Sequence, residues 1–315
     1  MPEYSRLRAG SVTVLGSLNT DFIVTQPRFP RPGETVQGNG FATMAGGKGL
    51  NQAVAAARSG ATVRLVGAVG DDTFGRSLVD FVAGEGIDVT GVAVLAATTG
   101  SAHIAVTAAG ENAIVLVAGA NGERLRLDDG VRAAVTDGTY LVTQAELPLP
   151  LVTEALAAAR ERGIVTVLTP SPVSVLGGVV PPGVDILVGN ELEVCELADA
   201  ADPRAAACRL SASVPIVIAT LGGDGVVWAI DGAIAGQRPA RPVAVVDTTG
   251  AGDTFVGALV ARLAAGDGLE TAVDWAVLAA SLSVSRAGAA PSIPTTEEIN
   301  ALLHLGALTE ERVRR

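Results

Sequence analysis

The 315-residue chain contains little cysteine, little histidine and no long apolar run, and each shortage excludes a class of protein. The two cysteines, Cys195 and Cys208, favour reduced thiols of a cytosolic protein over a disulfide framework. The two histidines, His103 and His304, are too few for a zinc cluster. The segment from Met1 to Gly10 has no signal-peptide core, and no run approaches the roughly 18 apolar residues of a membrane span. We therefore expect a soluble, cytoplasmic protein.

Basic and aromatic residues are scarce as well. There are 22 Lys and Arg against 33 Asp and Glu, a formal net charge of -11, and no stretch gathers the basic residues into a stripe. Most of the surface should therefore repel nucleic acid and anionic membranes. Aromatic residues make up 3% of a chain that is 49% hydrophobic, so the core is built from Ala, Val, Leu and Gly. Such a core suits helices packed tightly on strands, in one large domain with a small appendage.

Short β-branched runs alternate with Ala-rich stretches of helical period along most of the chain. This alternation, with nearly continuous apolar strands, predicts an α/β fold in which helices cover both faces of a mostly parallel sheet. The expected strands are residues 12–15, 62–66, 140–143, 164–168, 185–188, 216–220, 226–230 and 243–246. The expected helices are residues 51–58, 74–84, 149–160, 252–264 and 270–286.

Two segments interrupt this alternation. Residues 17–45 are rich in Pro and Gly and have no helical period, and residues 101–117 are typical of a hairpin that turns at residues 109–112. We expect these two pieces to pair into a small sheet, a lid over the carboxyl edge of the main sheet, where open α/β folds bind ligands. Long surface loops are the alternative. The expected domains are a core of residues 1–16, 46–100 and 118–315 and a lid of residues 17–45 and 101–117.

The expected lid also predicts how the chain assembles. Its outer face would expose apolar side chains, among them Ile104, Val106, Ile114 and Leu116. Burying them against a second subunit would remove both the apolar patch and the open strand edges. We therefore expect a homodimer that forms through the lids.

The strongest chemical signal is the segment from Asp247 to Phe255, DTTGAGDTF. A glycine-rich turn leads into an apolar helix, so backbone N–H groups of the Gly250 to Gly252 stretch should lie at a helix N-terminus and bind a phosphate or a developing anion. Asp253, in the first turn of that helix, is placed to accept a proton from a substrate hydroxyl. A simple helix cap is the alternative interpretation of this aspartate.

Two further stretches suit a sugar. Asn19 and Asp21 are two residues apart, so on an extended backbone both face the same side and can bind vicinal hydroxyls. The glycines of residues 45–52 let the backbone approach a ligand, and Lys48 and Asn51 can point into the same space. A polar strand end and a flexible loop are the respective alternatives.

Nucleotide motifs of other folds are missing. A Walker A loop needs a glycine five residues before its Gly-Lys pair, but Ala42 stands there and Gly49 follows Lys48. The dinucleotide motif fails after the first strand, where Gly16 precedes Ser-Leu-Asn. These departures exclude a P-loop NTPase and an NAD-dependent dehydrogenase.

Three stretches together resemble the signature regions of the PfkB family of carbohydrate kinases, and within it the ribokinases. They are Pro32 to Val36 (PGETV), Gly46 to Ala53 (GGKGLNQA) and Asp247 to Phe255. The similarity runs from about Val12 to Pro294, nearly the whole chain. It implies a ribokinase-like three-layer α/β sandwich with a small β-sheet lid. It also implies ATP with Mg²⁺ and an activating K⁺.

The resemblance also assigns roles to single residues. Asp253 matches the catalytic base, which also contacts the sugar, and Gly250, Ala251 and Gly252 match the anion hole. The implied sugar contacts are Asn19, Asp21, Gly46, Gly47, Lys48, Gly49, Asn51 and Glu146. The implied ATP contacts are Asn190, Thr220, Leu221, Gly222, Gly223, Gly225, Gly252 and Val277. Glu193 would arrange Mg²⁺ indirectly, and the implied K⁺ site comprises Asp247, Thr249, Ser283, Arg286, Gly288 and Ser292.

Several of these residues have a purely structural interpretation. Asn190 and Glu193 have the spacing of a capping box, and Gly222 to Gly225 can be an ordinary turn between two strands. Val277 stands near the expected adenine position where ribokinases can carry a polar residue, which leaves the fine nucleotide preference open.

The sequence therefore predicts ATP-dependent phosphorylation of the primary hydroxyl of a pentose, with D-ribose giving ribose 5-phosphate as the favoured reaction. The compact glycine loop favours an unsubstituted pentose, because a nucleoside base would need an apolar or aromatic platform. Deoxyribose, pseudouridine, adenosine and fructose are alternative acceptors within the family. A non-catalytic sugar-sensing protein is the alternative from another class.

Overall fold

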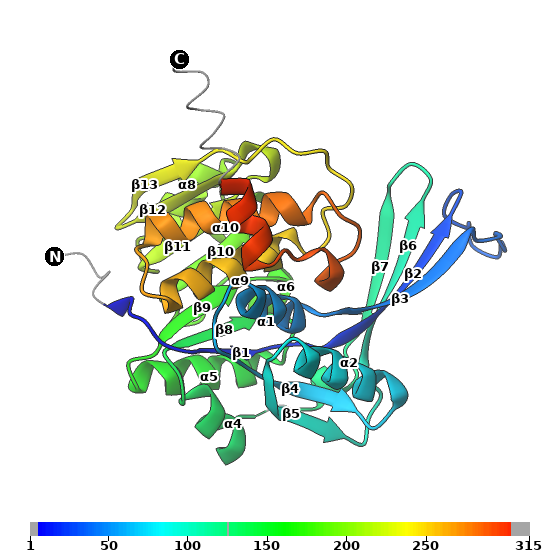
Figure 1. The fold of residues 1–315 in the computed structure, drawn as a ribbon, viewed down its shortest axis with the longest axis horizontal. Helices are drawn as coiled ribbons and strands as arrows, with labels where there is room; N and C mark the ends of the chain where they lie inside the picture. The colour runs from blue at the N-terminus through cyan, green and yellow to red at the C-terminus, as the bar shows by residue number, and fades with distance from the viewer. Residues whose placement is uncertain (1–5, 125, 304–315) are drawn as a thin grey trace.

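The computed structural model describes residues 6–124 and 126–303. Residues 1–5 and His304 lie outside this range. Within the described residues a nine-stranded sheet forms the centre of the molecule (Figure 1), and no helix there is long and apolar enough to cross a membrane. In spatial order its strands are β13 (Ala233–Arg238), β12 (Val226–Ile230), β11 (Ile216–Thr220), β10 (Ile186–Asn190), β9 (Val165–Thr169), β8 (Tyr140–Gln144), β1 (Val12–Leu15), β4 (Val63–Gly70) and β5 (Asp88–Leu95).

The sheet is mostly parallel, as predicted. Neighbouring strands from β11 to β5 pair in parallel, whereas β12 and β13 are antiparallel additions at one edge. Successive strand residues alternate between two apolar clusters on opposite faces, so Val14 belongs to one cluster and Leu15 to the other. Both faces are therefore buried, which explains the continuous apolar runs in the strand sequences.

Helices form the two outer layers. One face is covered by α1 (Lys48–Arg58), α2 (Thr73–Gly84), α9 (Ala251–Ala264) and α10 (Leu269–Ser283). The other is covered by α4 (Asp129–Val135), α5 (Leu149–Glu161), α7 (Glu191–Ala198) and α8 (Pro203–Leu210). The short helices α3 (Ala120–Glu123) and α6 (Val173–Leu176) lie in connections. This three-layer arrangement confirms the predicted fold class.

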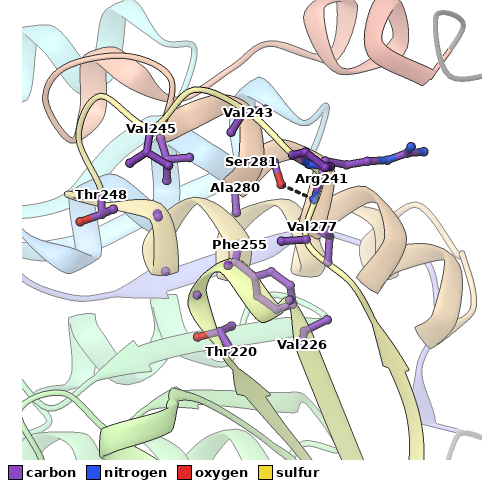
Figure 2. A pocket seen from close by; sticks show the side chains of 18 residues that line it. Thr220, Val226, Arg241, Val243, Val245, Thr248, Phe255, Val277, Ala280 and Ser281 are labelled. Carbon is purple, nitrogen blue, oxygen red and sulfur yellow. Dashed lines mark hydrogen bonds between the residues drawn. The ribbon is translucent and has the colours of Figure 1, made fainter.

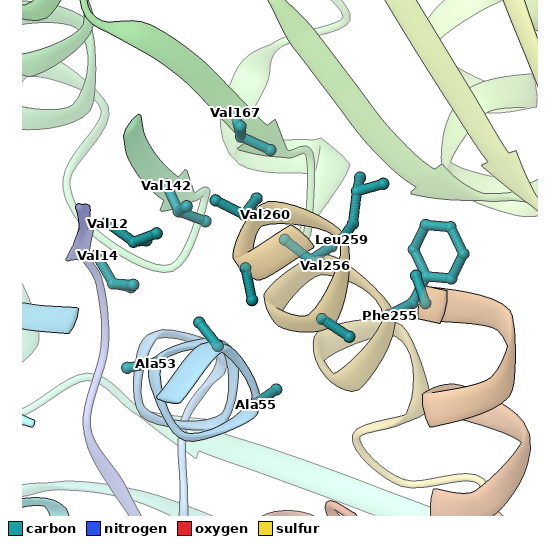
Figure 3. Close-up of a cluster of buried hydrophobic side chains, with 14 of the residues drawn as sticks. Val12, Val14, Ala53, Ala55, Val142, Val167, Phe255, Val256, Leu259 and Val260 are labelled. Atoms are coloured by element: carbon teal, nitrogen blue, oxygen red, sulfur yellow. The ribbon is translucent and has the colours of Figure 1, made fainter. Parts of the chain in front are cut away.

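The packing of α1 against α9 brings two distant parts of the chain together. In Figure 3, Val256 and Val260 of α9 face the strand residues Val142 and Val167. Gly257 of α9 lies so close to α1 that an added Cβ would overlap its backbone. The N-terminal ends of α1 and α9, which carry the candidate functional residues, are therefore held side by side.

A second, four-stranded sheet stands to one side of the core (Figure 1). It contains β3 (Gly40–Gly46), β2 (Asn19–Gln26), β6 (Gly100–Thr107) and β7 (Asn112–Val117) in that order. β2 and β6 pair in parallel and the other pairs are antiparallel, so the expected hairpin is present as β6 and β7. The small sheet predicted from the two interrupting segments is confirmed.

The register of this sheet corrects one expectation. Asp21 pairs with Ala102, Ile23 with Ile104, and Ile104 with Ile114. Directly paired residues point to the same face of a sheet. Ile104, Val106, Ile114 and Leu116 therefore share the face of Asn19 and Asp21, and do not form the outer face as expected. The opposite face carries Phe22 and His103, whose rings stack at 5.2 Å.

Residues 243–246 do not form the predicted strand. They belong to an irregular stretch, and Val245 and Val246 are 64% and 63% exposed. The amides of Val246 and Asp247 donate to the Val284 carbonyl at 2.7 and 3.2 Å, so the segment docks on the end of α10 instead of a strand. β-branched composition cannot distinguish these two forms of extended backbone. The edge strands β5 and β13 and the helices α4 and α8 were not predicted, and α10 ends at Ser283 rather than at residue 286.

Candidate functional site

The residues expected to contact a sugar converge at the carboxyl edge of the central strands. Asn19 and Asp21 begin β2 directly after β1, and Glu146 follows the end of β8. Lys48 and Asn51 lie in the first turn of α1. Because the carboxyl ends of parallel strands meet at one edge of a sheet, segments far apart in sequence become neighbours here.

Asp253 is held in one orientation by two side-chain amides. It lies in the first turn of α9 and is 6% exposed. Its Oδ2 accepts a hydrogen bond from Asn51 Nδ2 at 3.1 Å, and its Oδ1 accepts one from Gln52 Nε2 at 2.9 Å. A carboxylate has about four lone-pair sites, so each oxygen can still accept a proton from a ligand.

Three carboxylates and one ammonium share this edge. Burial raises the pKa of Asp21 to about 7, with smaller contributions from the charges of Glu146 and Asp253. Burial also raises the pKa of Glu146, although the charge of Lys48 opposes it. The Asp253 carboxylate raises the pKa of Lys48 against the effect of that residue's own burial. Hydrogen-bond acceptors outnumber donors here, so this end of the site suits a neutral ligand rich in hydroxyls.

Ser17 and Asn121 fix the site's backbone, although neither was expected there. The Ser17 hydroxyl donates to Glu146 Oε2. Asn121 Nδ2 donates to Asn19 Oδ1 at 2.8 Å and to the Leu18 carbonyl at 3.1 Å, while its Oδ1 accepts from Leu18 N at 3.1 Å. Asn19 therefore presents its Nδ2 donor to a ligand. Because Asn121 is 102 residues from Asn19 along the chain, no local sequence pattern could reveal this contact.

The glycines at the start of α1 permit close approach of the chain to itself. A Cβ at Gly46 would overlap the Asp21 carboxylate, and one at Gly49 would overlap the backbone of Gly16. Gly47, the residue that precedes α1, has φ 91°, which favours glycine. These glycines therefore let Asp21 and the start of α1 come together beside Glu146 and Lys48.

A cavity of about 400 Å³ lies on the other side of the α9 N-terminus (Figure 2). Figure 2 shows apolar walls from Val226, Phe255 and Val277, with Val243 and Val245 of the irregular segment opposite. Such a slot suits a planar base, with polar groups only at its ends. The expected ATP contacts that line it are Thr220, Gly222, Gly223, Gly225, Gly252 and Val277.

Other expected ATP contacts do not line this cavity. Leu221 packs against the apolar cluster on the opposite face of the sheet. Asn190 and Glu193 form a reciprocal capping box at the start of α7, with Glu193 N donating to Asn190 Oδ1 and Asn190 N to Glu193 Oε2, both at 2.9 Å. The capping box expected as the structural alternative for this pair is therefore formed. Asn190 Nδ2 and Glu193 Oε1 remain for other partners, and the Glu193 charge reaches Lys48.

The α9 N-terminus joins the two halves of the site. Gly250 has left-handed backbone with φ 74° and precedes the helix. The Ala251 amide donates to the Thr248 carbonyl at 3.3 Å, whereas no such bond engages the amides of Gly250 and Gly252 among the described residues. A Cβ on Gly252 would meet nothing within 4 Å, so protein packing does not require glycine there. The open space beside Gly252 is available to a ligand.

Asp247 connects the loop before α9 to the segment after α10. Its Oδ1 accepts from the Thr249 amide and hydroxyl at 2.9 and 2.7 Å, and its Oδ2 accepts from Gly288 N at 2.8 Å. Partial burial opposes ionisation, but these hydrogen bonds outweigh it and lower the pKa of Asp247. The Arg286 side chain pairs with Glu298 at 2.7 Å, so this arginine faces the segment only through its backbone.

Further members of the expected K⁺ site lie in the same segment. The Ser283 carbonyl accepts from Arg286 N at 3.1 Å, which closes the turn after α10. The buried Ser292 hydroxyl donates to the Ala289 carbonyl at 2.8 Å and leaves its lone pairs free to accept. The structure therefore joins Asp247, Thr249 and Gly288 directly and places Ser283 and Ser292 on the adjoining turns.

The pKa of Asp21 predicts a pH-dependent stability. Since its folded pKa of about 7 exceeds the ordinary 3.8, the folded protein binds the proton more tightly, and stability falls as pH rises from about 4 to 7. Asp21→Asn should remove this loss. Without ligand, the difference in unfolding free energy between the variant and the parent should therefore rise by about 2–3 kcal/mol from pH 5 to pH 8. Urea denaturation measures this, with the exposed Asp80→Asn as control. A gain that is the same at both pH values contradicts the assignment.

The chain resembles known kinases over most of its length. Residues 9–296 match the model of the pfkB family carbohydrate kinases. The ribokinase of Haemophilus influenzae is 37% identical over 301 residues, covering 91% of this chain and 96% of that protein. The ribokinase of Bacillus subtilis is 37% identical over 306 residues, covering 93% and 99%.

Solved structures agree with this similarity. The ribokinase of Thermotoga maritima matches with a TM-score of 0.86 and 32% identity, covering 93% of this chain and 99% of that one. The Arabidopsis thaliana ribokinase complexed with ribose and ATP matches with a TM-score of 0.84 and 31% identity, covering 94% and 99%. With matched sequence and matched fold, the chain belongs to the pfkB family of carbohydrate kinases.

Proposed function

We propose that this kinase transfers the γ-phosphoryl group of ATP to the primary hydroxyl of D-ribose and forms ribose 5-phosphate. One observation carries the proposal: adjacent residues of a single helix turn face two different parts of the site. Gly252 lines the apolar cavity, while Asp253 contacts Asn51 on the hydroxyl-binding side. A nucleotide phosphate and a sugar hydroxyl would therefore meet at the α9 N-terminus. The similarity to ribokinases, one of them complexed with ribose and ATP, supports the choice of substrates.

The residues of the chain supply positioning and charge. Asp21 accepts from, and Asn19 donates to, vicinal sugar hydroxyls, and Glu146 accepts from a third. Asp253 takes the proton of the primary hydroxyl as phosphoryl transfer proceeds. The amides of the Gly250 to Gly252 stretch stabilise the charge that develops, together with the helix dipole. The lid excludes water, which would otherwise accept the phosphoryl group.

Mg²⁺ bound to the ATP phosphates would neutralise their charge when present. Mg²⁺ usually keeps several waters and binds through one or two carboxylates plus phosphates. Glu193 fits such an indirect role, since its Oε1 is not used by the capping box. Asn190 and Leu221 do not line the apolar cavity. They would contribute to ATP binding by fixing the loops in which they lie.

The acceptor is proposed to be an unsubstituted pentose. A nucleoside such as adenosine or pseudouridine would need an apolar or aromatic platform for its base. The lid aromatics Phe22 and His103 face away from Asp21, because neighbouring residues of a strand point to opposite faces. Deoxyribose and fructose remain alternative acceptors, since Asn19 and Asp21 contact hydroxyls common to several sugars. A sugar sensor without catalysis is disfavoured by the intact Asp253.

Asp253→Asn tests the reaction and the base together. The amide keeps the shape of the side chain but accepts no proton, so kcat should fall by at least ~10²–10⁴-fold while ribose still binds. ATP-dependent phosphorylation is measured for the parent and the variant over a panel of pentoses, hexoses and nucleosides, with ribose binding followed by calorimetry. Turnover of the variant near the parental rate would show that Asp253 is not the base. A parent that phosphorylates another acceptor better than ribose would overturn the substrate assignment.

We also propose that K⁺ activates the enzyme through the Asp247 loop. Asp247 holds Thr249 and Gly288 together, and carbonyls at the end of α10 and the buried Ser292 adjoin them. Carbonyls at a helix end have no intrahelical partners and suit a large, weakly hydrated cation. The ion would act without touching substrate, by fixing the loop that leads to the Gly250 amide.

Replacing Na⁺ or Tris by K⁺ at constant ionic strength should therefore raise the rate, mainly through kcat. Initial rates with saturating Mg²⁺ and ATP measure this effect, and Asp247→Asn should weaken it. Equal rates in the three buffers remove the cation site from the mechanism.

The small sheet is proposed to act as a lid of residues 17–45 and 101–117 over a core of residues 1–16, 46–100 and 118–315, and to join two copies. Ile114 and Leu116, on the lid face that also carries Asn19 and Asp21, are 52% and 54% exposed, and β7 is an edge strand. A second lid would cover both the apolar surface and the open edge. The free, half-buried Cys195 and Cys208 suit a cytoplasmic location.

A lid-mediated dimer should be seen by light scattering at micromolar protein concentration. Ile114→Asp should dissociate it, because the substitution places a charge in the apolar contact. Val179→Asp, at an exposed position outside the lid, should leave the dimer intact. A monomeric parent contradicts the proposal.

A further inference from the structure

Two glutamines lie completely buried beneath the proposed base. Gln52 of α1 and Gln144, the last residue of β8, both have 0% exposure. A buried amide is unfavourable unless its polar atoms are hydrogen-bonded, so two such side chains in a core of Ala, Val and Leu need a reason. Neither was among the residues expected to contact sugar or nucleotide.

The glutamines form a chain of hydrogen bonds that ends on Asp253. Gln144 Nε2 donates to Gln52 Oε1 at 2.7 Å, and Gln52 Nε2 donates to Asp253 Oδ1 at 2.9 Å. Gln52 Nε2 also lies 3.2 Å from Thr169 Oγ1, at the end of β9. The chain therefore runs from the carboxyl ends of two central strands to the N-terminus of α9.

The direction of these bonds follows from the chemistry of the carboxylate. An ionised aspartate only accepts hydrogen bonds, so Gln52 must turn its Nε2 toward Asp253. Its Oε1 then faces Gln144, which must present a donor in turn. Gln144 thus selects the orientation of the Gln52 amide. The Gln144 Oε1 is buried and has no partner within the described residues. Such an unpaired buried acceptor costs stability.

We propose that Gln144 and Gln52 form a positioning relay that orients Asp253 for proton transfer. The inference rests on the proposed role of Asp253 as base. The charged groups that act on Asp253 are Asp21 from β2, Glu146 beyond β8 and Lys48 from α1. Two of these three are acidic and disfavour a further negative charge. The Gln52 donor opposes them at Oδ1, as Asn51 does at Oδ2.

Gly16 makes room for the relay. A Cβ at Gly16 would overlap the Gln144 Oε1 and the backbone of Gly49. The strand end that leads to Asn19 and Asp21 and the first turn of α1 therefore both lie against Gln144. The orientation of Asp253 and the packing of the segment that carries Asn19 and Asp21 therefore both depend on the contact between Gly16 and Gln144.

Gln144→Glu is the sharpest test, because glutamate has nearly the same shape but, when ionised, only accepts. Gln52 should turn its Nε2 toward the introduced carboxylate and its Oε1 toward Asp253. We expect kcat to fall by roughly 10–100-fold, the range of a lost hydrogen bond to a charged group. The KM for ribose should change little, because Gln144 reaches Asp253 only through Gln52.

Methionine variants provide a second test that introduces no buried charge. Gln52→Met and Gln144→Met keep the length of the side chain and remove the amide. If Gln144 acts only through Gln52, then Gln144→Met should lower kcat in the parent but have no further effect in Gln52→Met. Thermal unfolding of every variant is measured alongside, and rates are taken well below each midpoint.

The outcomes separate the relay from the proposed reaction. Parental phosphorylation of ribose and its loss in Asp253→Asn test the reaction and the base without reference to either glutamine. The relay is judged only on ratios of variant to parent, with whichever sugar the parent phosphorylates. Additive effects of the two methionine substitutions, or a kcat in Gln144→Glu that stays near the parental value while the unfolding midpoint falls, would reduce the glutamines to structural residues and overturn the relay.

Discussion

The contact between α1 and α9 is the constraint on which the site depends. Gly257 allows the two helices to approach so closely that a methyl group would not fit between them. Their N-terminal turns consequently lie together, with Asn51 and Gln52 of one helix bonded to Asp253 of the other. Both turns stand at the carboxyl edge of the parallel sheet, where the strand ends supply Asn19, Asp21 and Gln144.

This arrangement concentrates charge that does not favour folding. The Asp21 carboxyl has a pKa of about 7 because it is buried beside two other acids. Lys48, Asn51 and Gln52 offset part of this repulsion, and a sugar with several hydroxyls would offset more when bound. Strain of this kind is common where binding energy serves a reaction, since the ligand completes what the empty site lacks.

Local patterns were sufficient for the elements with strong signals. β1, β8, β11 and β12 were predicted within a residue because they are short apolar runs bounded by turn residues. The edge strand β13 is mostly exposed and mixes apolar with polar residues, so it gave no such signal. Residues 243–246 were predicted as a strand because β-branched composition reports extended backbone. Only a neighbouring strand makes a sheet, however, and none of the described strands pairs with them. The outward face expected for Ile104 was wrong because the register between β2 and β6 is a tertiary property.

By itself the amino-acid sequence determined the class of fold, the glycine-rich turns and the identity of the chemical groups, since each depends on residues close along the chain. Asp253, Lys48 and the Asn19 and Asp21 pair could be chosen because their neighbours created recognisable local geometry. The sequence did not determine which side chains bond to them. Asn121, Gln52 and Gln144 come from elements joined only by packing, and one wall of the apolar cavity comes from a segment that docks on α10. Those contacts depend on how helices and strands pack in three dimensions, so only the tertiary structure could decide them.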